Sequence, residues 1–221
     1  MARGWSARRS ALTRNDQGRS ARTIGGPSSV RPVTAAPAPR FDRLVELTAD
    51  QLRARLAEAL QVYVDAMGYP PVTAQQRAPM WSAHTLRPGW RCIGAFNTAD
   101  ELIGIGYGYR GVPGQWWHEQ VLRGLLTNRS RDEAEQWMQD YFELTELHVR
   151  PDSQGGGLGE TILRRLLDGA PGKAVLLSTP EGPTRAWKLY RRVGFEDVLR
   201  DYRFTGDPRP FAVLGRSLPL D

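Results

Sequence analysis

The chain has few of the residues that build disulfide bonds or metal centres. Cys92 is its only cysteine among 221 residues, so no disulfide can form within the chain, and a reducing compartment suits it. Neither Cys92 nor His84 and His118 has the neighbouring partners that a metal site or a catalytic dyad requires. We therefore expect no metal and a cytoplasmic location.

Long apolar runs are also missing. No stretch approaches the roughly 20 apolar residues of a membrane-spanning helix, so we expect no membrane span. The N-terminus lacks the apolar core of a secretory signal, and no internal repeat has a solenoid period.

Acidic residues are scarce in the first 40 positions, which contain eight Arg and one Asp. With so few aliphatic side chains, this segment cannot bury enough apolar surface to fold, and we expect a disordered Arg-rich tail and linker at 1–40. The remainder has 22 basic and 23 acidic residues, so nucleic-acid binding by the domain itself is not expected. Binding of nucleic acid by the tail stays open as an alternative.

The most informative segment is a glycine loop between a strand and a helix. Strand-like residues at 144–149 lead to Gly155-Gly156-Gly157, and a helical pattern begins at Leu158. The backbone N–H groups of such a loop lack partners and point outward, where the helix dipole adds positive charge. This arrangement predicts a phosphate or pyrophosphate site.

Two common phosphate motifs do not fit this loop. Gly-Lys-Ser/Thr is absent after the glycines, and the pattern G-x-G-x-x-G fails in both registers. The pattern Gln/Arg-x-x-Gly-x-Gly/Ala does fit, with Gln154, Gly157 and Gly159. A second pattern, Ala-x-x-Leu-Tyr-x-x-x-Gly-Phe, spans residues 186–195, with a strand at 174–178 between the two. Together they make the chain resemble the GNAT superfamily of acetyl-CoA-dependent N-acetyltransferases over roughly residues 41–205.

The resemblance implies the fold. It is an α/β (α+β) domain at 41–221, with a mixed, mostly antiparallel sheet of six or seven strands flanked by about four helices, and an insertion at 111–138. Sequence patterns predict strands at 41–47, 90–96, 101–109, 144–149, 174–178, 195–204 and 211–214. They predict helices at 48–67, 73–86, 115–126 and 131–139, another from Leu158, and a last one with Pro183 at its first position and Gly194 just after it.

The strand at 101–109 is unusual, because Gly104, Gly106 and Gly108 alternate with large apolar residues. A bare strand face lets another backbone or a ligand come close. Tight packing of a helix over this face and a ligand-binding role are equally compatible with the pattern.

The resemblance also implies how acetyl-CoA, the acyl donor, is held. Backbone groups of Leu147 and Val149 would pair with the pantetheine arm. Gln154, the first residue of the Gln/Arg-x-x-Gly-x-Gly/Ala pattern, begins the loop that would hold the pyrophosphate. The N–H groups that would hold the pyrophosphate belong to Gly155, Gly156, Gly157, Leu158, Gly159 and Glu160.

The implied reaction is direct transfer within a ternary complex. Tyr190 would protonate the leaving sulfur, and an ordinary tyrosine pKa near 10 suits that role. Glu143, eleven residues before Gln154, is the preferred base. Glu146 is kept as the second candidate, since it lies on the opposite face of a regular strand and a bulge would change that. A base acting through water, or none, is the alternative, and His148 is interpreted as structural.

The expected acceptor is a cationic primary amine. Acidic residues outnumber Arg131 between Ser130 and Glu146, which favours a lysine, a peptide N-terminus, a polyamine or an aminoglycoside. For Asp132, Glu133 and Glu135 a solvated helix face is the simpler interpretation.

One departure from the family pattern concerns Pro183, where many members have Asn. Thr184 or Glu181 would have to replace its contact to the cofactor. Two rival functions also stay open: an acyl-CoA-sensing module without turnover, and a protein that acts through its tail. A homodimer formed through the C-terminal strand is a further possibility.

Overall fold

The structure is a computed structural model that describes residues 41–220. The predicted Arg-rich tail and linker at 1–40 lies outside the described residues. The domain assignment of 41–221 with its insertion therefore stays a prediction, although the fold of the described part is defined element by element.

Seven strands form one sheet within residues 41–220, in the order β1-β2-β3-β4-β5-β7-β6. Only β4 and β5 pair in parallel. The strands are β1 (Arg43–Glu46), β2 (Arg91–Phe96), β3 (Leu102–Arg110), β4 (Tyr141–Val149), β5 (Ala174–Pro180), β6 (Glu196–Tyr202) and β7 (Phe211–Ser217). This confirms the predicted mixed, mostly antiparallel sheet.

The same residues contain seven α-helices, whereas the resemblance implied about four and the sequence patterns predicted six. They are α1 (Ala49–Ala54), α2 (Leu56–Met67), α3 (Val72–His84), α4 (Trp116–Asn128), α5 (Arg131–Met138), α6 (Leu158–Leu167) and α7 (Arg185–Arg192), with a short 3₁₀ turn η1 (Pro151–Ser153). Two of the helices beyond the family's four are α4 and α5 of the predicted insertion. The third arises because a break at Arg55 divides the expected 48–67 helix into α1 and α2. None of the helices in the described part combines the length and apolar character that a membrane crossing requires.

Helix ends follow local chemistry. Thr48 and Gln51 form the predicted capping box of α1. The predicted start of α7 was wrong by two residues: Arg185 is the first helical residue, where Pro183 was expected. Thr184 is the N-cap, and its hydroxyl accepts from the Trp187 N–H at 3.1 Å. Gly194 follows the helix with φ +87°, as predicted.

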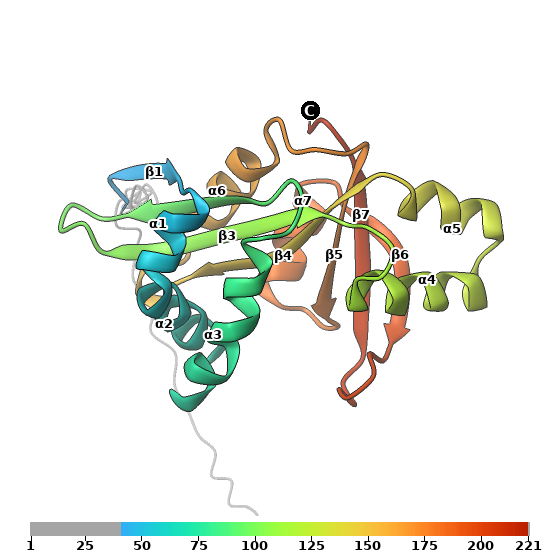
Figure 1. Cartoon of the computed structure of the whole chain (residues 1–221), viewed down its shortest axis with the longest axis horizontal. Helices are drawn as coiled ribbons and strands as arrows, with labels where there is room; N and C mark the ends of the chain where they lie inside the picture. The colour runs from blue at the N-terminus through green and yellow to red at the C-terminus, as the bar shows by residue number, and fades with distance from the viewer. Residues whose placement is uncertain (1–40, 221) are drawn as a thin grey trace, which may run out of the picture. The chain divides into compact units, whose positions relative to one another are not determined.

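Helices cover both faces of the sheet. One face packs against α6 and α7, through Ile162, Leu166 and Tyr190 among others. The other face has two separate apolar clusters, one under α1–α3 around Trp81 and one under α4 and α5 around Leu125. In Figure 1, α1–α3 lie beside the β1–β4 part of the sheet, α4 lies beside β6, and α5 lies next to α4.

The glycine face of β3 is covered by a helix. A Cβ atom on Gly104 would lie 2.8 Å from Ile162 Cδ1, and one on Gly106 would lie 2.8 Å from Ile162 Cγ2. The glycines therefore bring α6 close to the sheet, which favours helix packing over the ligand-binding alternative for these two positions.

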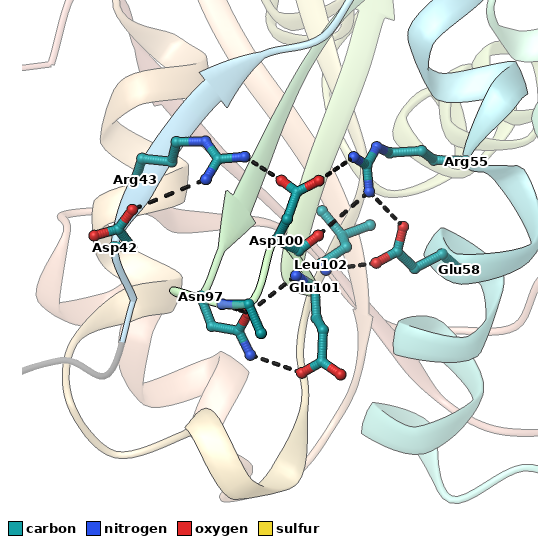
Figure 2. A network of polar contacts seen from close by, with 9 residues as sticks. Asp42, Arg43, Arg55, Glu58, Asn97, Asp100, Glu101 and Leu102 are labelled. Atoms are coloured by element: carbon teal, nitrogen blue, oxygen red, sulfur yellow. Dashed lines mark hydrogen bonds and ion pairs between the residues drawn. The ribbon is translucent and has the colours of Figure 1, made fainter.

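Polar contacts fasten the β2–β3 hairpin to its neighbours (Figure 2). The carboxylate of Asp100 pairs with Arg43 of β1 and with Arg55, whose Nη2 lies 2.8 Å away. Arg55 also contacts Glu58 at 2.9 Å, and Glu58 accepts the Leu102 N–H at 2.6 Å. Since these ion pairs are largely exposed, each contributes little, but the Glu58 contact gives a backbone donor at the start of β3 its partner.

Replacing Gly106 with alanine should destabilise the fold by about 1–3 kcal/mol, because a β-branched side chain 2.8 Å away must move. Urea unfolding of the variant measures the change. Gly159→Ala is the matched control: its added methyl would lie 3.6 Å from the nearest atom and favours a helix, so stability should stay within about 1 kcal/mol. Equal midpoints for both variants would contradict the proposed close packing.

Candidate active site

A β-bulge in β4 determines which side chains face α2 and α3. Tyr107 of β3 lies opposite Glu146, whereas Gly108 lies opposite Leu144, so Thr145 has no opposite residue. Opposed residues of an antiparallel pair point to the same face, and Tyr109 lies opposite Glu143. The bulge therefore brings both candidate bases to one face, the parity change that a bulge was expected to produce.

The strands β4 and β5 separate just before this bulge. Their parallel ladder covers Tyr141–Glu143 and Ala174–Leu176, after which β5 pairs with β7 alone among the described strands. The Arg150 N–H donates to the Ile103 carbonyl at 2.9 Å, so the peptide groups of Leu147 and Val149 face away from β3 by alternation. Among the described residues, the N–H groups of both residues and the Leu147 carbonyl thus form an open strand edge on the β5 side, where the resemblance places the pantetheine arm. The Val149 carbonyl on the same edge accepts from the Gln154 side chain at 2.8 Å.

The glycine loop leads directly into α6. Gly155 and Gly157 have φ of +91° and +83°, and no atom lies within 4 Å of where their Cβ atoms would be. Within residues 41–220, no hydrogen bond uses the N–H of Gly155, Gly156, Gly157, Leu158 or Gly159. The loop is therefore open to a ligand and presents several donors at a helix N-terminus.

Glu160 does not share this property. Its N–H donates to the Gly157 carbonyl at 3.0 Å, and its carboxylate contacts Arg164 and Arg192 at 3.1 and 2.9 Å. The expected role of its N–H in holding a pyrophosphate conflicts with this first-turn hydrogen bond. The remaining five donors stay a prediction.

Gln154 connects the end of β4 with α7. Its amide nitrogen donates to the Val149 carbonyl at 2.8 Å, and its amide oxygen accepts from Arg185 at 2.7 Å. Arg185 was missed in the sequence, where nothing marks a single arginine at the start of a later helix. Its position adds a positive charge beside the glycine loop.

Glu143 is a buried carboxyl group, only 4% exposed. The Tyr109 hydroxyl donates to its Oε1 at 3.2 Å, while its Oε2 is buried and has no partner among the described residues. Burial raises the pKa of Glu143 from about 4.5 to about 8, and the hydrogen bond from Tyr109 opposes that rise. An acid of this kind exchanges a proton near neutral pH, as a general base must.

Glu146 forms a close pair with His148. The distance from Glu146 Oε2 to His148 Nε2 is 2.5 Å, and the ring of Tyr63 from α2 lies edge-on to the imidazole at 5.0 Å. The sequence interpretation treated His148 as structural and did not pair it with Glu146. Their spacing of two residues on one strand was the signal that would have placed both side chains on one face.

Tyr190 lies inside the core of the α6 and α7 face. It is 7% exposed and its ring packs against Phe195 at 5.4 Å. Burial, and to a smaller degree the charge of Glu146, raises the pKa of Tyr190 well above its ordinary value. The expectation of an ordinary tyrosine pKa was therefore wrong, and the group is a firmly protonated hydroxyl.

The other two histidines have tyrosine partners. His84 Nδ1 lies 3.0 Å from the Tyr107 hydroxyl, and His118 Nδ1 lies 3.0 Å from the Tyr141 hydroxyl. Burial lowers the pKa of His84 to about 4, which keeps it neutral. The described residues contain no cluster of His, Cys, Asp and Glu that could hold a metal ion.

Two of the acidic residues between Ser130 and Glu146 already have partners. Glu133 caps α5 through Ser130, which agrees with the helix-face interpretation of this residue, and Asp140 pairs with Arg110 at 2.8 Å. Thr184 and Glu181, the residues proposed to replace the Asn of the family pattern, also have partners. The Thr184 hydroxyl caps α7, and the Glu181 carboxylate accepts from Arg200 at 2.7 Å and from the Asp201 N–H.

A cavity of about 460 Å³ lies between the C-terminal end of α2 and the residues that follow β4. Its lining includes Asp65, Tyr69, Arg150 and Asp152. A second, of about 280 Å³, shares Arg150 and Asp152 with it. Both cavities therefore flank the segment that joins β4 to the glycine loop.

A mixed sheet whose one parallel pair separates, a glycine loop that opens a helix, and carboxylates on the strand before that loop are together typical of an acetyltransferase. Residues 63–195 match the family described as Acetyltransferase (GNAT) family. The chain is 48% identical over 202 residues to the GCN5-like protein acetyltransferase Rv2170 of Mycobacterium tuberculosis, covering 80% of this chain and 98% of that protein. The chain belongs to the GNAT acetyltransferase family.

Solved structures agree at the level of the fold. A GNAT superfamily phosphinothricin acetyltransferase from Sinorhizobium meliloti, in complex with AcCoA, has a TM-score of 0.53 at 16% identity over 80% of this chain and 88% of its own. The ribosomal-protein-alanine N-acetyltransferase from Brucella melitensis has a TM-score of 0.51 at 17% identity, covering 80% and 99%.

The buried carboxyl of Glu143 should make stability depend on pH. Its raised pKa means that the proton stabilises the folded state fully below the ordinary value near 4.5, and that this contribution is lost as pH rises through about 8. Wild type should therefore lose stability relative to Glu143→Gln between pH 5 and 9, as measured by urea unfolding. The exposed control Glu135→Gln should follow the wild type, and parallel curves for Glu143→Gln would contradict the burial argument.

Proposed function

We propose that this protein transfers the acetyl group of acetyl-CoA to a primary amine of a protein or peptide. The observation that carries the proposal is the row of five N–H groups at the start of α6 that have no acceptor among residues 41–220, next to the open edge of β4. A diphosphate needs such donors, and an extended arm needs such an edge. The family membership supports the same donor.

The residues that would hold the donor fit its chemistry. The N–H groups from Gly155 to Gly159 suit the pyrophosphate, and Arg185 adds charge beside them. The peptide groups of Leu147 and Val149 suit the amide-bearing arm. Bound there, the thioester supplies an activated acetyl carbon: the amine nitrogen forms the new C–N bond, the C–S bond breaks, and the thiolate takes a proton.

Two residues would manage the protons. Glu143, with its raised pKa, takes the proton from the acceptor ammonium, directly or through a water, so that the amine becomes nucleophilic. The protonated hydroxyl of Tyr190 gives a proton to the leaving sulfur. The ammonium thus gives one proton to Glu143 before attack, and the nitrogen loses a second proton as the amide forms. Tyr190 gives one proton to the sulfur and regains that second proton, so the products are an amide, a thiol and the proton held by Glu143.

The acceptor class rests on charge and on relatives. Carboxylates on the β4 face attract a cation. The relative at 48% identity is named a protein acetyltransferase. Over 68 residues, which are 29% of this chain and 43% of the other protein, the chain is also 41% identical to a Mycobacterium tuberculosis protein named N-alpha-acetyltransferase RimI. A lysine side chain or peptide N-terminus is therefore proposed ahead of a polyamine or aminoglycoside.

Gly157→Glu should abolish acetyl-CoA binding in a calorimetric titration, because a carboxylate would project where the pyrophosphate is held. Gly114→Glu is the matched control: Gly114 has a similar φ of +85° and equally open surroundings, but precedes α4. It should bind acetyl-CoA like the wild type. Unchanged affinity in Gly157→Glu would sink the donor assignment.

Tyr190→Phe should leave acetyl-CoA affinity unchanged and slow transfer by about 10²–10⁴-fold, the usual contribution of a proton donor. Single-turnover transfer to a lysine-bearing peptide with a free N-terminus measures the effect, and calorimetry measures the affinity. Binding by the wild type without transfer to peptides, polyamines or aminoglycosides would instead favour the sensing module. A wild-type rate in Tyr190→Phe would remove Tyr190 from the reaction.

A further inference from the structure

The Glu146–His148 pair is a preformed element that the proton transfers leave without a role. Both side chains are largely covered, at 15% and 11% exposed, and their atoms approach to 2.5 Å. Burying a carboxylate this far is costly unless a donor satisfies it, and His148 supplies that donor. Because the Tyr63 ring packs edge-on against the imidazole, the orientation of the pair is set by α2 as well as by β4.

The bulge at Thr145 gives this pair its place. It turns Glu146 to the face that Glu143 occupies, so two carboxyl groups three residues apart lie under α2 and α3. The charge of Glu146 acts on both groups that are proposed to move protons, since it raises the pKa of Glu143 and of Tyr190. Glu146 therefore lies in the electrostatic neighbourhood of base and acid together.

The two carboxyl groups differ in what they can do. The Glu143 Oε2 has no partner among the described residues, and the group is neutralised readily, which suits a proton acceptor. Glu146 already shares its Oε2 with His148, which suits a fixed charge whose second oxygen can receive a further donor. An ammonium group has three donors on one nitrogen and can contact both carboxyl groups at once.

We propose that Glu146, oriented by His148, binds the ammonium group of the acceptor and presents it to Glu143, so that this pair restricts the enzyme to cationic amines. The inference rests on the proposed acetyl transfer and assigns its acceptor subsite. Glu146 touches the substrate in this scheme, whereas His148 is a positioning residue. The Tyr63 ring keeps the imidazole aligned with the carboxylate.

A matched pair of acceptors tests charge recognition. The first is a lysine-bearing peptide with a free N-terminus, and the second is its analogue with aminooxy groups in place of both amines. The aminooxy group is nucleophilic, similar in length, and uncharged at neutral pH. In full-length Glu146→Gln, KM for the cationic peptide should rise by at least about tenfold with little change in kcat, since a charged contact in a covered site is lost. KM for the neutral analogue should stay the same.

Conservative and control variants separate positioning from structure. His148→Ala should raise KM for the cationic peptide in the same way, and His148→Gln, which keeps a donor for Glu146, should restore most of the affinity. Glu135→Gln removes an exposed carboxylate on α5 and should change neither acceptor. Urea unfolding and acetyl-CoA titration of each variant verify that the fold and donor site persist.

The outcomes are distinct. Equal losses for the charged and neutral acceptors, or no loss for either, would overturn recognition of charge by Glu146. Failure of His148→Gln to restore affinity would overturn positioning by His148. A wild-type protein that binds acetyl-CoA but acetylates neither peptide would contradict the proposed function itself, before any variant is compared.

Discussion

The parallel contact between β4 and β5 extends over only three residue pairs, and the separation that follows determines where the site residues lie. Up to Glu143 the two strands share a ladder that anchors β4 in the middle of the sheet. Immediately afterwards the bulge at Thr145 bends β4 and shifts its register against β3. The separation from β5 thus leaves an open edge along the second half of β4, and the bulge turns Glu146 and His148 to the sheet face that is covered by α2 and α3.

Burial of polar groups on the helix-covered face follows one rule. Tyr107 has a hydrogen-bond partner in His84, Tyr141 in His118, and Tyr109 in Glu143, so these three phenols on this face are each satisfied. Glu143 differs from the histidines because it has a second oxygen that the fold leaves unpartnered. A carboxyl group that remains buried and half-satisfied has a raised pKa, and this is the physical basis for its proposed role as base.

The glycine loop depends on how closely α6 approaches the sheet. The bare face of β3 allows Ile162 to pack directly on the backbone of Gly104 and Gly106, which holds the axis of α6 near the end of β4. The first turn of α6 then lies beside the open edge of β4, so N–H donors and strand edge are adjacent. Packing of this kind holds an anion-binding loop on a rigid element instead of leaving it to a flexible segment.

Much of the fold was predictable from the sequence, because its signals are local. Apolar periodicity gave most of the strands and helices, the Thr48–Gln51 pair marked the start of α1, and the glycine loop with the second motif indicated the family, which the comparisons confirmed. Contacts between distant segments were not predictable: the bulge at Thr145, the position of Arg185 beside Gln154 and the raised pKa of Tyr190 depend on which surfaces meet. The Glu146–His148 pair was overlooked, although the spacing of two residues on one strand indicates a shared face.

The sequence by itself determined the order of the elements, the donor-rich loop and the acetyltransferase family, since periodicity and turn residues act over a few positions. Only the tertiary structure decided which carboxyl group is buried and which is paired. Register shifts and burial arise from the packing of whole strands and helices, so a single residue's neighbourhood in the sequence does not contain them.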